Sequence, residues 1–181
     1  MEACVTMKTY SQERQDLFVV EQTKGKRNGV FLDIGCAHPI QINNTYLLET
    51  EYGWSGICID LDSSHNEAWK SRLATFLNQN ALTIDYEELI GNIAVGGVID
   101  YLSLDLEPPS VTHECLFKIP FDKYKFSVLT YEHDRYREGD TFRNSSRDYL
   151  KSKGYRLVVP DVKCGGQEFE DWYIFEEMYN G

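Results

Sequence analysis

Residues 30–39, with the sequence VFLDIGCAHP, constrain the fold of this chain more than any other segment. Apolar residues surround a single acid, Asp33, and a buried carboxylate is costly unless a partner balances it. Gly35 then permits a tight turn and a close approach of the backbone to a ligand. A strand followed by a small-residue turn, with an acid at its carboxyl end, is typical of nucleotide-binding α/β sheets. The alternative is a core strand that runs into an ordinary turn.

The order of the predicted elements favours an α/β fold. Apolar runs predict strands at 30–35, 56–60, 81–84, 98–105, 124–131, 155–159 and 172–175. Helices are predicted at 44–52, 86–93, 111–118 and 142–153, with a short helix or strand-like segment at 11–21. A further helix is predicted to begin at Ser63 or Ser64 and to bury Trp69, Leu73 and Phe76. Strands that alternate with helices form a mostly parallel sheet with helices on both faces, and only about a dozen residues separate the last two strands, which predicts an antiparallel final pair.

The composition bounds the class of protein and its partners. With 42% hydrophobic and 26% charged residues, the 181-residue chain suits one globular domain, residues 1–181. Nucleic acid is bound through clustered Lys and Arg, so the net charge of −11 argues against that partner. No apolar run approaches the roughly 20 residues that span a bilayer, and the N-terminus lacks a signal pattern. We therefore expect a cytoplasmic protein that binds neither nucleic acid nor membrane.

The five cysteines form neither a disulfide framework nor a zinc pattern. They are odd in number and include no C-x-x-C pair. Cys36 and Cys58 lie in or beside apolar runs. We expect both to be buried, reduced thiols rather than nucleophiles.

Acidic residues follow four of the predicted strands. In an open parallel sheet, ligands bind outside the carboxyl ends of the strands. Asp60 lies 25 residues after Gly35, close to the ~20-residue offset of a carboxylate that binds ribose hydroxyls, and Asp62 is an alternative for this role. The alternative for any one acid is that it caps a helix or turn, but acids after four strands at one edge predict a site. These acids are Asp33, Asp60, Asp105 with Glu107, and Glu132 with Asp134.

The loop after the first strand separates two cofactors that this arrangement can bind. A nicotinamide dinucleotide needs glycines so that its pyrophosphate can sit on a helix N-terminus. Here His38 and Pro39 occupy the positions of the later glycines. S-adenosylmethionine carries no phosphate, and its cationic sulfonium suits a loop with an acidic rim. The residues favour S-adenosylmethionine, and a nicotinamide-dependent oxidoreductase is the weaker alternative.

Six segments of the chain match motifs of a known family. They are YSQERQDLFV (10–19), FLDIG (31–35), NTYLLE (44–49), GWSGICID (53–60), IDYLSLDLE (99–107) and FEDWY (169–173). On these segments the chain resembles the FkbM-type branch of class I S-adenosylmethionine-dependent methyltransferases. The resemblance implies a Rossmann-like class I methyltransferase fold: a mostly parallel seven-stranded sheet with an antiparallel last strand and helices on both faces. Such proteins usually methylate hydroxyl groups, often on sugars or other small metabolites.

The resemblance also implies a role for particular residues in binding S-adenosylmethionine. An N-terminal segment, residues 1–29, would cover the cofactor. The implied cofactor-binding residues are Gln15 and Asp16 in this segment; Asp33, Gly35 and Cys36 at the amino-acid end; Asp60 and Leu61 at the ribose; Asn80 and Ala81 at the adenine; and Asp105 and Leu106 near the methyl group.

Three positions depart from the family pattern. His38-Pro39 replaces the usual Asp-Gly type of loop ending, and Asn80 replaces an acid. Pro108-Pro109 follows Glu107, where the family commonly has Gly. The first two favour the alternative of a non-catalytic S-adenosylmethionine-binding module, and the third indicates a subgroup with its own acceptor.

The candidates for chemistry at the acceptor follow the fourth and fifth predicted strands. Methyl transfer is an in-line displacement, and a hydroxyl acceptor gains about 10²–10⁴-fold from a general base. His133 is the first candidate because an unperturbed His titrates near neutrality, and Glu132 or Asp134 would orient it. Glu107 is the second candidate. As an alternative, these acids together with Asp105 supply oxygen ligands of the type that Mg²⁺ prefers.

Four arginines, Arg135, Arg137, Arg143 and Arg147, follow these acids. A salt-bridged helix face is the favoured interpretation, and contact with a phosphorylated or acidic acceptor is the alternative.

These features predict an S-adenosylmethionine-dependent O-methyltransferase whose substrate is a small molecule, a sugar or a related metabolite. The chain has little length beyond the core fold, so we expect an acceptor cleft that is either open or completed by another subunit. The oligomeric state stays open, with a homodimer as one alternative.

Overall fold

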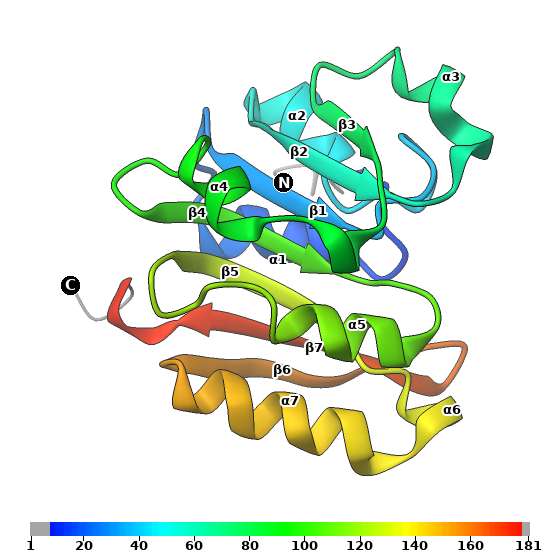
Figure 1. Cartoon of the computed structure of the whole chain (residues 1–181), viewed down its shortest axis with the longest axis vertical. Coiled ribbons are helices and arrows are strands. Elements are labelled where there is room, and N and C mark those ends of the chain that lie inside the picture. Colours follow the sequence, from blue (N-terminus) through cyan, green and yellow to red (C-terminus); the bar gives the residue numbers. More distant parts are fainter. Residues whose placement is uncertain (1–7, 179–181) are drawn as a thin grey trace, which may run out of the picture.

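The computed structural model describes residues 8–178, which form a seven-stranded sheet between two layers of helices (Figure 1). The strands lie in the order β3-β2-β1-β4-β5-β7-β6. Their bounds are β1 Val30–Ile34, β2 Ser55–Asp60, β3 Thr75–Asn78, β4 Val98–Leu104, β5 Lys125–Glu132, β6 Tyr155–Cys164 and β7 Gln167–Phe175. The α-helices are α1 Gln15–Gln22, α2 Tyr46–Tyr52, α3 Asn66–Trp69, α4 Tyr86–Gly91, α5 Pro109–Leu116, α6 Arg135–Glu138 and α7 Asp140–Ser152.

The direction of the strands confirms the predicted fold class. Strands β1 to β5 pair in parallel, whereas β7 is antiparallel to both β5 and β6. The last two strands form the hairpin that the short segment between them predicts. Because β1 lies between β2 and β4, the strand order reverses at β1. Open α/β sheets bind ligands beside such a reversal.

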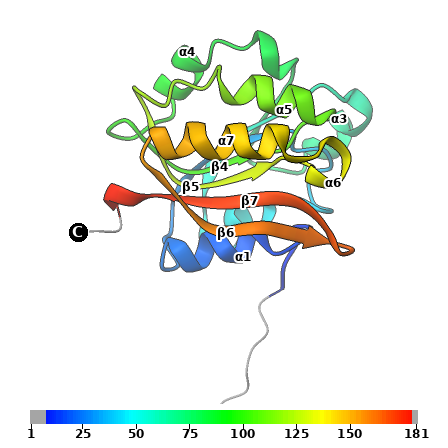
Figure 2. The ribbon, with the colours of Figure 1, turned by 90° about the horizontal axis from the view of Figure 1, so that it is seen from below.

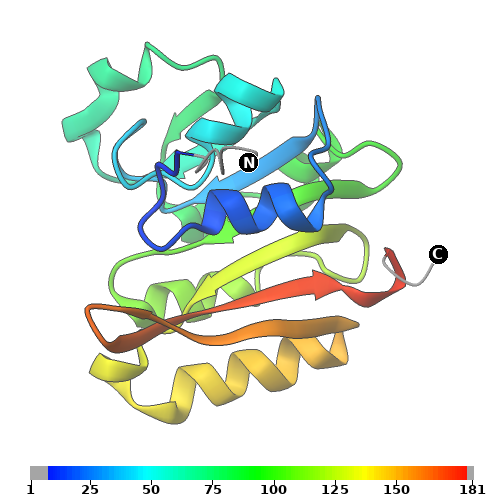
Figure 3. The same cartoon turned by 180° about the vertical axis from the view of Figure 1, so that it is seen from behind.

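The sheet buries apolar side chains on both faces, as a covered parallel sheet requires. Along β1, Phe31 packs with Phe18 of α1 and Leu48 of α2. The next residue, Leu32, belongs to the opposite cluster, together with Leu150 of α7. Figures 2 and 3 show α1 on one face of the sheet and α4, α5 and α7 on the other. By the alternation of a strand, Asp33 points to the same face as Phe31, towards α2.

Two predictions between β2 and α4 are wrong. The helix that follows Ser63 is short: a 3₁₀ helix, Ser63–His65, leads into α3, which ends at Trp69. Leu73 is 94% exposed because Glu49 accepts the backbone N–H groups of Leu73 and of the next residue, which pulls the chain away from helix. The third strand is β3, not residues 81–84, which form a 3₁₀ turn instead.

The last two strands are longer than predicted. Strand β6 continues through Pro160 to Cys164, with irregular register against β7 between Leu157 and Lys163. Proline is tolerated there because β6 lies at the edge of the sheet and Pro160 need not donate to a ladder. Helix α6 was not predicted, because it has only four residues and no apolar period.

Within residues 8–178, the structure contains no helix with the length and apolar character needed to cross a bilayer. Cys36, Cys58 and Cys115 are buried free thiols, and Cys164 is a half-buried one. Cys4 lies outside the described residues.

Gly35 makes the closest backbone contact between two strands at the site. It has a φ of +89°, and a Cβ at this position would lie 1.5 Å from the backbone oxygen of Asp105. The end of β1 therefore passes so close to the end of β4 that no side chain fits between them.

Gly35→Ala should consequently destabilise the protein far more than Gly96→Ala. Gly96 has a similar positive φ of +62° but no atom within 4 Å of a built Cβ, so it reports only the ~1–2 kcal/mol cost of the left-handed conformation. The clash at Gly35 adds at least about 2 kcal/mol to that cost. Urea denaturation of both variants measures the difference, and equal losses would contradict the close contact.

Candidate functional site

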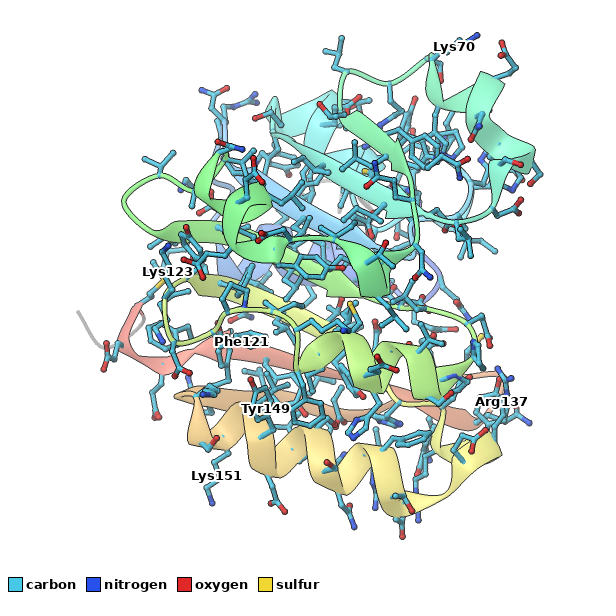
Figure 4. All side chains as sticks on the ribbon, viewed as in Figure 1. Lys70, Phe121, Lys123, Arg137, Tyr149 and Lys151 are labelled. Atoms are coloured by element: carbon cyan, nitrogen blue, oxygen red, sulfur yellow. The ribbon has the colours of Figure 1, made fainter. Side chains whose placement is uncertain are left out.

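A cavity of about 800 Å³ lies at the carboxyl ends of β1, β2 and β4. These ends face one edge of the sheet, on the side where Arg137 projects and opposite the edge that carries Lys123 (Figure 4). The volume is in the range of small-molecule sites. The cavity is lined by Gly35, Ala37, His38, Gln41, Ile42, Asp60, Leu61, Asp62, His65, Asp105, Leu106 and Glu107.

The structure brings together six of the predicted site residues on this cavity: Gly35, Asp60, Leu61, Asp105, Leu106 and Glu107. Asp60 ends β2 and ties the neighbouring loop to it, since its Oδ2 accepts the N–H of Ala37 at 2.8 Å. Its Oδ1 accepts the N–H of Asp62 at 2.8 Å. The carboxylate of Asp62 accepts from both the N–H and the hydroxyl of Ser64, so Asp62 caps the following 3₁₀ helix. The capping role thus falls to Asp62, and Asp60 is held at the cavity wall.

The loop between β1 and α2, residues 35–45, is built by side chains rather than by glycines. His38 Nδ1 accepts the N–H groups of Ile40 at 3.1 Å and Gln41 at 3.0 Å. Asn43 Nδ2 donates to the carbonyl oxygens of Cys36 at 3.2 Å and His38 at 3.1 Å. Because Nδ1 of His38 is an acceptor, the ring proton is on Nε2, and the ring lines the cavity beside that of His65, 5.1 Å away between centroids.

Asp33 and Cys36 lie behind the cavity wall rather than on it. Asp33 is 2% exposed and accepts a hydrogen bond from Thr45 Oγ1 at 3.0 Å. Burial raises the pKa of Asp33 to about 6, and the bond from Thr45 opposes this shift. Burial also raises the pKa of the Cys36 thiol, which favours the predicted packing role over a nucleophilic one.

Carboxylates gather beyond Asp105, at the ends of β4 and β5. Burial raises the pKa of Asp105, and burial together with the nearby Asp105 raises the pKa of Glu132. Two carboxylates this close share a proton more readily than they ionise together. Arg137 Nη1 pairs with Glu107 at 2.7 Å and with Asp134 at 2.9 Å, but no Lys or Arg within residues 8–178 pairs with Asp105 or Glu132.

Gln15 and Asp16 are buried at the start of α1 and do not line the cavity. Asp16 fastens the preceding segment, because its carboxylate accepts from Thr9 Oγ1 at 2.6 Å and from the N–H of Tyr10 at 2.8 Å. Gln15 Nε2 donates to Glu170 Oε2 at 2.9 Å. Gln15 thus ties the start of α1 to β7, and Asp16 ties the preceding segment to α1.

At the predicted adenine end, the side chain of Asn80 accepts the N–H of Leu82 at 2.9 Å and caps the 3₁₀ helix there. Asn80 is exposed and Ala81 is buried, and neither lines the cavity. Leu61 and Ile42 do line it, and they are 67% and 66% exposed. The role of Ile42 was missed, because an isolated apolar residue in a polar loop gives no signal in the sequence.

The geometry does not favour His133 as the general base. Its side chain is fully buried and does not line the cavity. Its Nδ1 accepts the N–H of Arg135 at 3.2 Å, and its Nε2 lies 3.5 Å from Asp171 Oδ1. The acid that faces the ring comes from β7 and not from the neighbouring residues Glu132 and Asp134. Among the predicted candidates for the base, Glu107 is the one on the cavity wall.

The predicted Mg²⁺ alternative is not supported. Within residues 8–178, only His133, Asp161 and Asp171 have ligand atoms grouped as around a metal, within 4.8 Å of one another. Arginines already balance these acids: Arg147 Nε lies 2.7 Å from Asp171, and Arg143 lies 2.9 Å from Asp161. Burial opposes the effect, but Arg147 holds the pKa of Asp171 below its usual range. The acids predicted as magnesium ligands, Asp105, Glu107, Glu132 and Asp134, do not converge in this way.

The four arginines form the salt-bridged face that the sequence favours. Arg135 pairs with Asp140 and with Glu168, in addition to the pairs of Arg137, Arg143 and Arg147. Because all four arginines are paired with acids of this chain, the structure does not favour their contact with an acidic acceptor.

Sequence analysis assigned no role to three further residues that shape the site. Thr45 bonds to Asp33, and the buried Arg72 reaches into the loop of residues 35–45 from the segment before β3. Glu170 of β7 lies near Asp105 and is 1% exposed. These contacts join residues that are far apart in the chain, so a local sequence pattern does not predict them.

Comparison with known proteins identifies the fold. No protein-family model matches the chain, and no curated protein matches it at a significant level. Membership of the FkbM branch is therefore not confirmed.

Solved structures match most of the chain at low identity. A rRNA methylase from Streptococcus thermophilus gives a TM-score of 0.57 at 12% identity, over 93% of this chain and 98% of that one. An S-adenosylmethionine-bound amino pentose methyltransferase from Micromonospora echinaspora gives 0.56 at 9%, over 93% and 92%. Magnesium protoporphyrin IX methyltransferase from Synechocystis, also with bound S-adenosylmethionine, gives 0.54 at 14%, over 90% and 78%. The chain thus has the fold of class I S-adenosylmethionine-dependent methyltransferases.

Glu170 makes the stability of the protein depend on pH in an uncommon direction. Burial raises its pKa from 4.5 to about 8. Between these values the folded protein keeps a proton that the unfolded chain has released. The free energy of unfolding should therefore fall as pH rises through this window, by up to ~1.4 kcal/mol per pH unit from this group.

Glu170→Gln should flatten the dependence of stability on pH between about 5 and 8, because glutamine has no proton to lose. Urea denaturation at several pH values compares the variant with the wild type. Asp33 also makes the free energy of unfolding depend on pH, at pH values up to its pKa of about 6, but it does so equally in both proteins. Parallel curves for the two proteins would show that Glu170 is ionised in the folded state at neutral pH.

Proposed function

We propose that this protein is an S-adenosylmethionine-dependent methyltransferase that methylates a hydroxyl of a small molecule, a sugar or a related metabolite. The observation that carries the proposal is the cavity of about 800 Å³ at the carboxyl ends of β1, β2 and β4, lined by Asp60 at the end of β2 and Asp105 directly after β4. In this fold, the cavity is where the strand order reverses.

The residues around the cavity suit a cationic ligand that has an apolar part and no phosphate. Asp105 and Glu132 lack a cationic partner among residues 8–178. The exposed side chains of Leu61 and Ile42 offer apolar surface for a flat ring, and Asp60 offers carboxylate oxygens to ribose hydroxyls. S-adenosylmethionine has all three of these features: a sulfonium, an adenine and a ribose.

The acceptor is proposed from the FkbM-type sequence motifs, since the names of the three similar structures give three different acceptors: a rRNA, magnesium protoporphyrin IX and an amino pentose. We propose a small-molecule acceptor and a cytoplasmic protein, with no nucleic acid or membrane partner. The single domain would keep residues 1–29 as the segment that covers the cofactor, and a homodimer would be one way to complete the acceptor cleft.

In the proposed reaction, the bound cofactor supplies a methyl group on a cationic sulfur. Burial raises the pKa of both Asp105 and Glu132, and the neighbouring Asp105 raises that of Glu132 further, which favours one shared proton and one negative charge on the pair. Glu107 lines the cavity beside Asp105 and pairs with Arg137 at 2.7 Å. We assign Glu107 as the residue that accepts the proton of the acceptor hydroxyl, in place of His133.

A non-catalytic S-adenosylmethionine-binding module is the second candidate. The observation in its favour is the enclosure of His133, the predicted base, away from the cavity. This candidate shares the cofactor with the first and differs in turnover.

Calorimetry with S-adenosylmethionine and S-adenosylhomocysteine tests the cofactor. Both should give saturable heat with one site per chain, whereas NADH should give none, because the loop of residues 35–45 offers few free N–H groups to a pyrophosphate. No heat from a folded sample at millimolar S-adenosylmethionine would refute both candidate functions. Heat from both, with no transfer of labelled methyl to any hydroxyl acceptor tried, would favour the non-catalytic module.

Asp105→Asn should weaken S-adenosylmethionine binding by about tenfold more than S-adenosylhomocysteine binding. Only the first ligand carries a sulfonium, and one lost charge interaction of ~1.4 kcal/mol is a tenfold change. Asp122→Asn is the matched control, since Asp122 is an exposed acid paired with Lys153 elsewhere on the surface. An equal loss for the two ligands would mean that Asp105 does not face the sulfur.

A further inference from the structure

Arg72 is a buried cation that contacts the loop of residues 35–45 and does not line the cavity. It sits between α3 and β3, with a fully buried side chain. Its Nη1 donates to the carbonyl oxygen of Pro39 at 2.6 Å and to Asn43 Oδ1 at 3.1 Å. Its Nη2 donates to Thr45 Oγ1 at 3.3 Å. The guanidinium thus spans the loop of residues 35–45 from its middle to its end.

The same guanidinium is held from behind. Its Nε lies 3.0 Å from Glu49 Oε1 of α2, and Glu49 is itself buried and fixed by the two N–H groups that follow Arg72. The guanidinium carbon lies 5.4 Å from the ring centroid of Tyr46 and 5.2 Å from that of Trp69. A planar, charged fork between two rings and a carboxylate has little freedom to move, so it is a fixed template for the loop.

The contacts of Arg72 continue to the cavity through Asn43. While Asn43 Oδ1 accepts from Arg72, its Nδ2 donates to the carbonyl oxygens of Cys36 and His38, the two residues around Ala37. Ala37 and His38 line the cavity. A second path runs through Thr45, whose hydroxyl donates to Asp33.

The loop needs such a template because two of its non-glycine residues have a strained backbone conformation. Ala37 and Ile42 have φ values of +45° and +53°, in the left-handed region that is unfavourable for L-residues. A loop of this kind keeps its conformation only where surrounding contacts over-determine it. Arg72 contacts this loop with three donor bonds, so it is well placed to do this.

We propose that Arg72 is a positioning residue for cofactor binding: it fixes the loop of residues 35–45 in the conformation that forms the cavity wall. The proposal rests on the proposed function, since it takes the cavity as the cofactor site. Arg72 does not line the cavity and acts through Asn43, Pro39 and Thr45. Without it, the loop should spend only part of its time in the competent conformation, and affinity falls by that fraction.

The test compares Arg72→Met, Arg72→Lys and a control variant, Leu150→Ala. Leu150 belongs to α7, is buried in the core and does not line the cavity. For each protein, hydrogen exchange measures protection of the amides in residues 36–45, and calorimetry measures the dissociation constant for S-adenosylmethionine. Thermal melting measures the loss of stability in each variant, so that Leu150→Ala can be compared with Arg72 variants of similar stability.

Arg72→Met should speed exchange in residues 36–45 and raise the dissociation constant by about tenfold or more. Arg72→Lys keeps the charge but not the fork, so it should recover only part of both properties, and it serves alone if Arg72→Met does not fold. Leu150→Ala should lose stability with the wild-type dissociation constant. Wild-type exchange in the loop and wild-type affinity in the Arg72 variants would overturn the proposal.

The two proposals fail in different ways. If the wild type does not bind S-adenosylmethionine, the proposed function fails, and the exchange data still decide whether Arg72 holds the loop. If the wild type binds and the Arg72 variants bind equally well, the positioning role fails and the proposed function stands.

Discussion

The site depends on the contact between Gly35 and the backbone of Asp105. The N–H of Asp105 donates to the carbonyl oxygen of Ile34 at 2.9 Å, so the ladder between β1 and β4 continues to the last residue of β1. One residue later there is no room for a side chain, and the chain must turn away. This turn starts the loop of residues 35–45 and leaves Asp105 at the open edge. The cavity between them is therefore a consequence of strand register and a single glycine.

The carboxylates at this edge of the sheet have two kinds of surroundings. Towards α7, arginines neutralise Asp161 and Asp171, and the pKa of Asp171 is held low. Towards the cavity, Asp105, Glu132 and Glu170 are desolvated, and their pKa values are raised. Buried charge without a partner destabilises a protein. Of these three residues Asp105 lines the cavity, so its carboxylate would gain a partner if a cation bound there.

The sequence predicts the strands that carry the site, because each is a local apolar run that stops at an acid or glycine. This holds for β1, β2, β4 and β5, and with them for Asp60, Asp105 and Glu107 on the cavity. Prediction from the sequence fails where a residue far away in the chain determines the local structure. Glu49 ends the helix near Leu73, although it is 24 residues away. Likewise, the Glu-His-Asp pattern around His133 indicated a local pair, but the partner of the imidazole is Asp171 on another strand.

His38 and Pro39 looked like departures from a glycine-rich loop, and the structure gives them a physical meaning. In a glycine loop, backbone N–H groups stay free to bind phosphate. Here Asp60 takes the N–H of Ala37, and His38 takes those of Ile40 and Gln41. The same side-chain contacts that fix the loop also occupy its backbone N–H groups. The residues that replace glycine therefore make the loop rigid and, at the same time, poor at binding a pyrophosphate. A ligand that is recognised by acids and apolar surface does not need these N–H groups. A dinucleotide does need them, because they would bind its pyrophosphate.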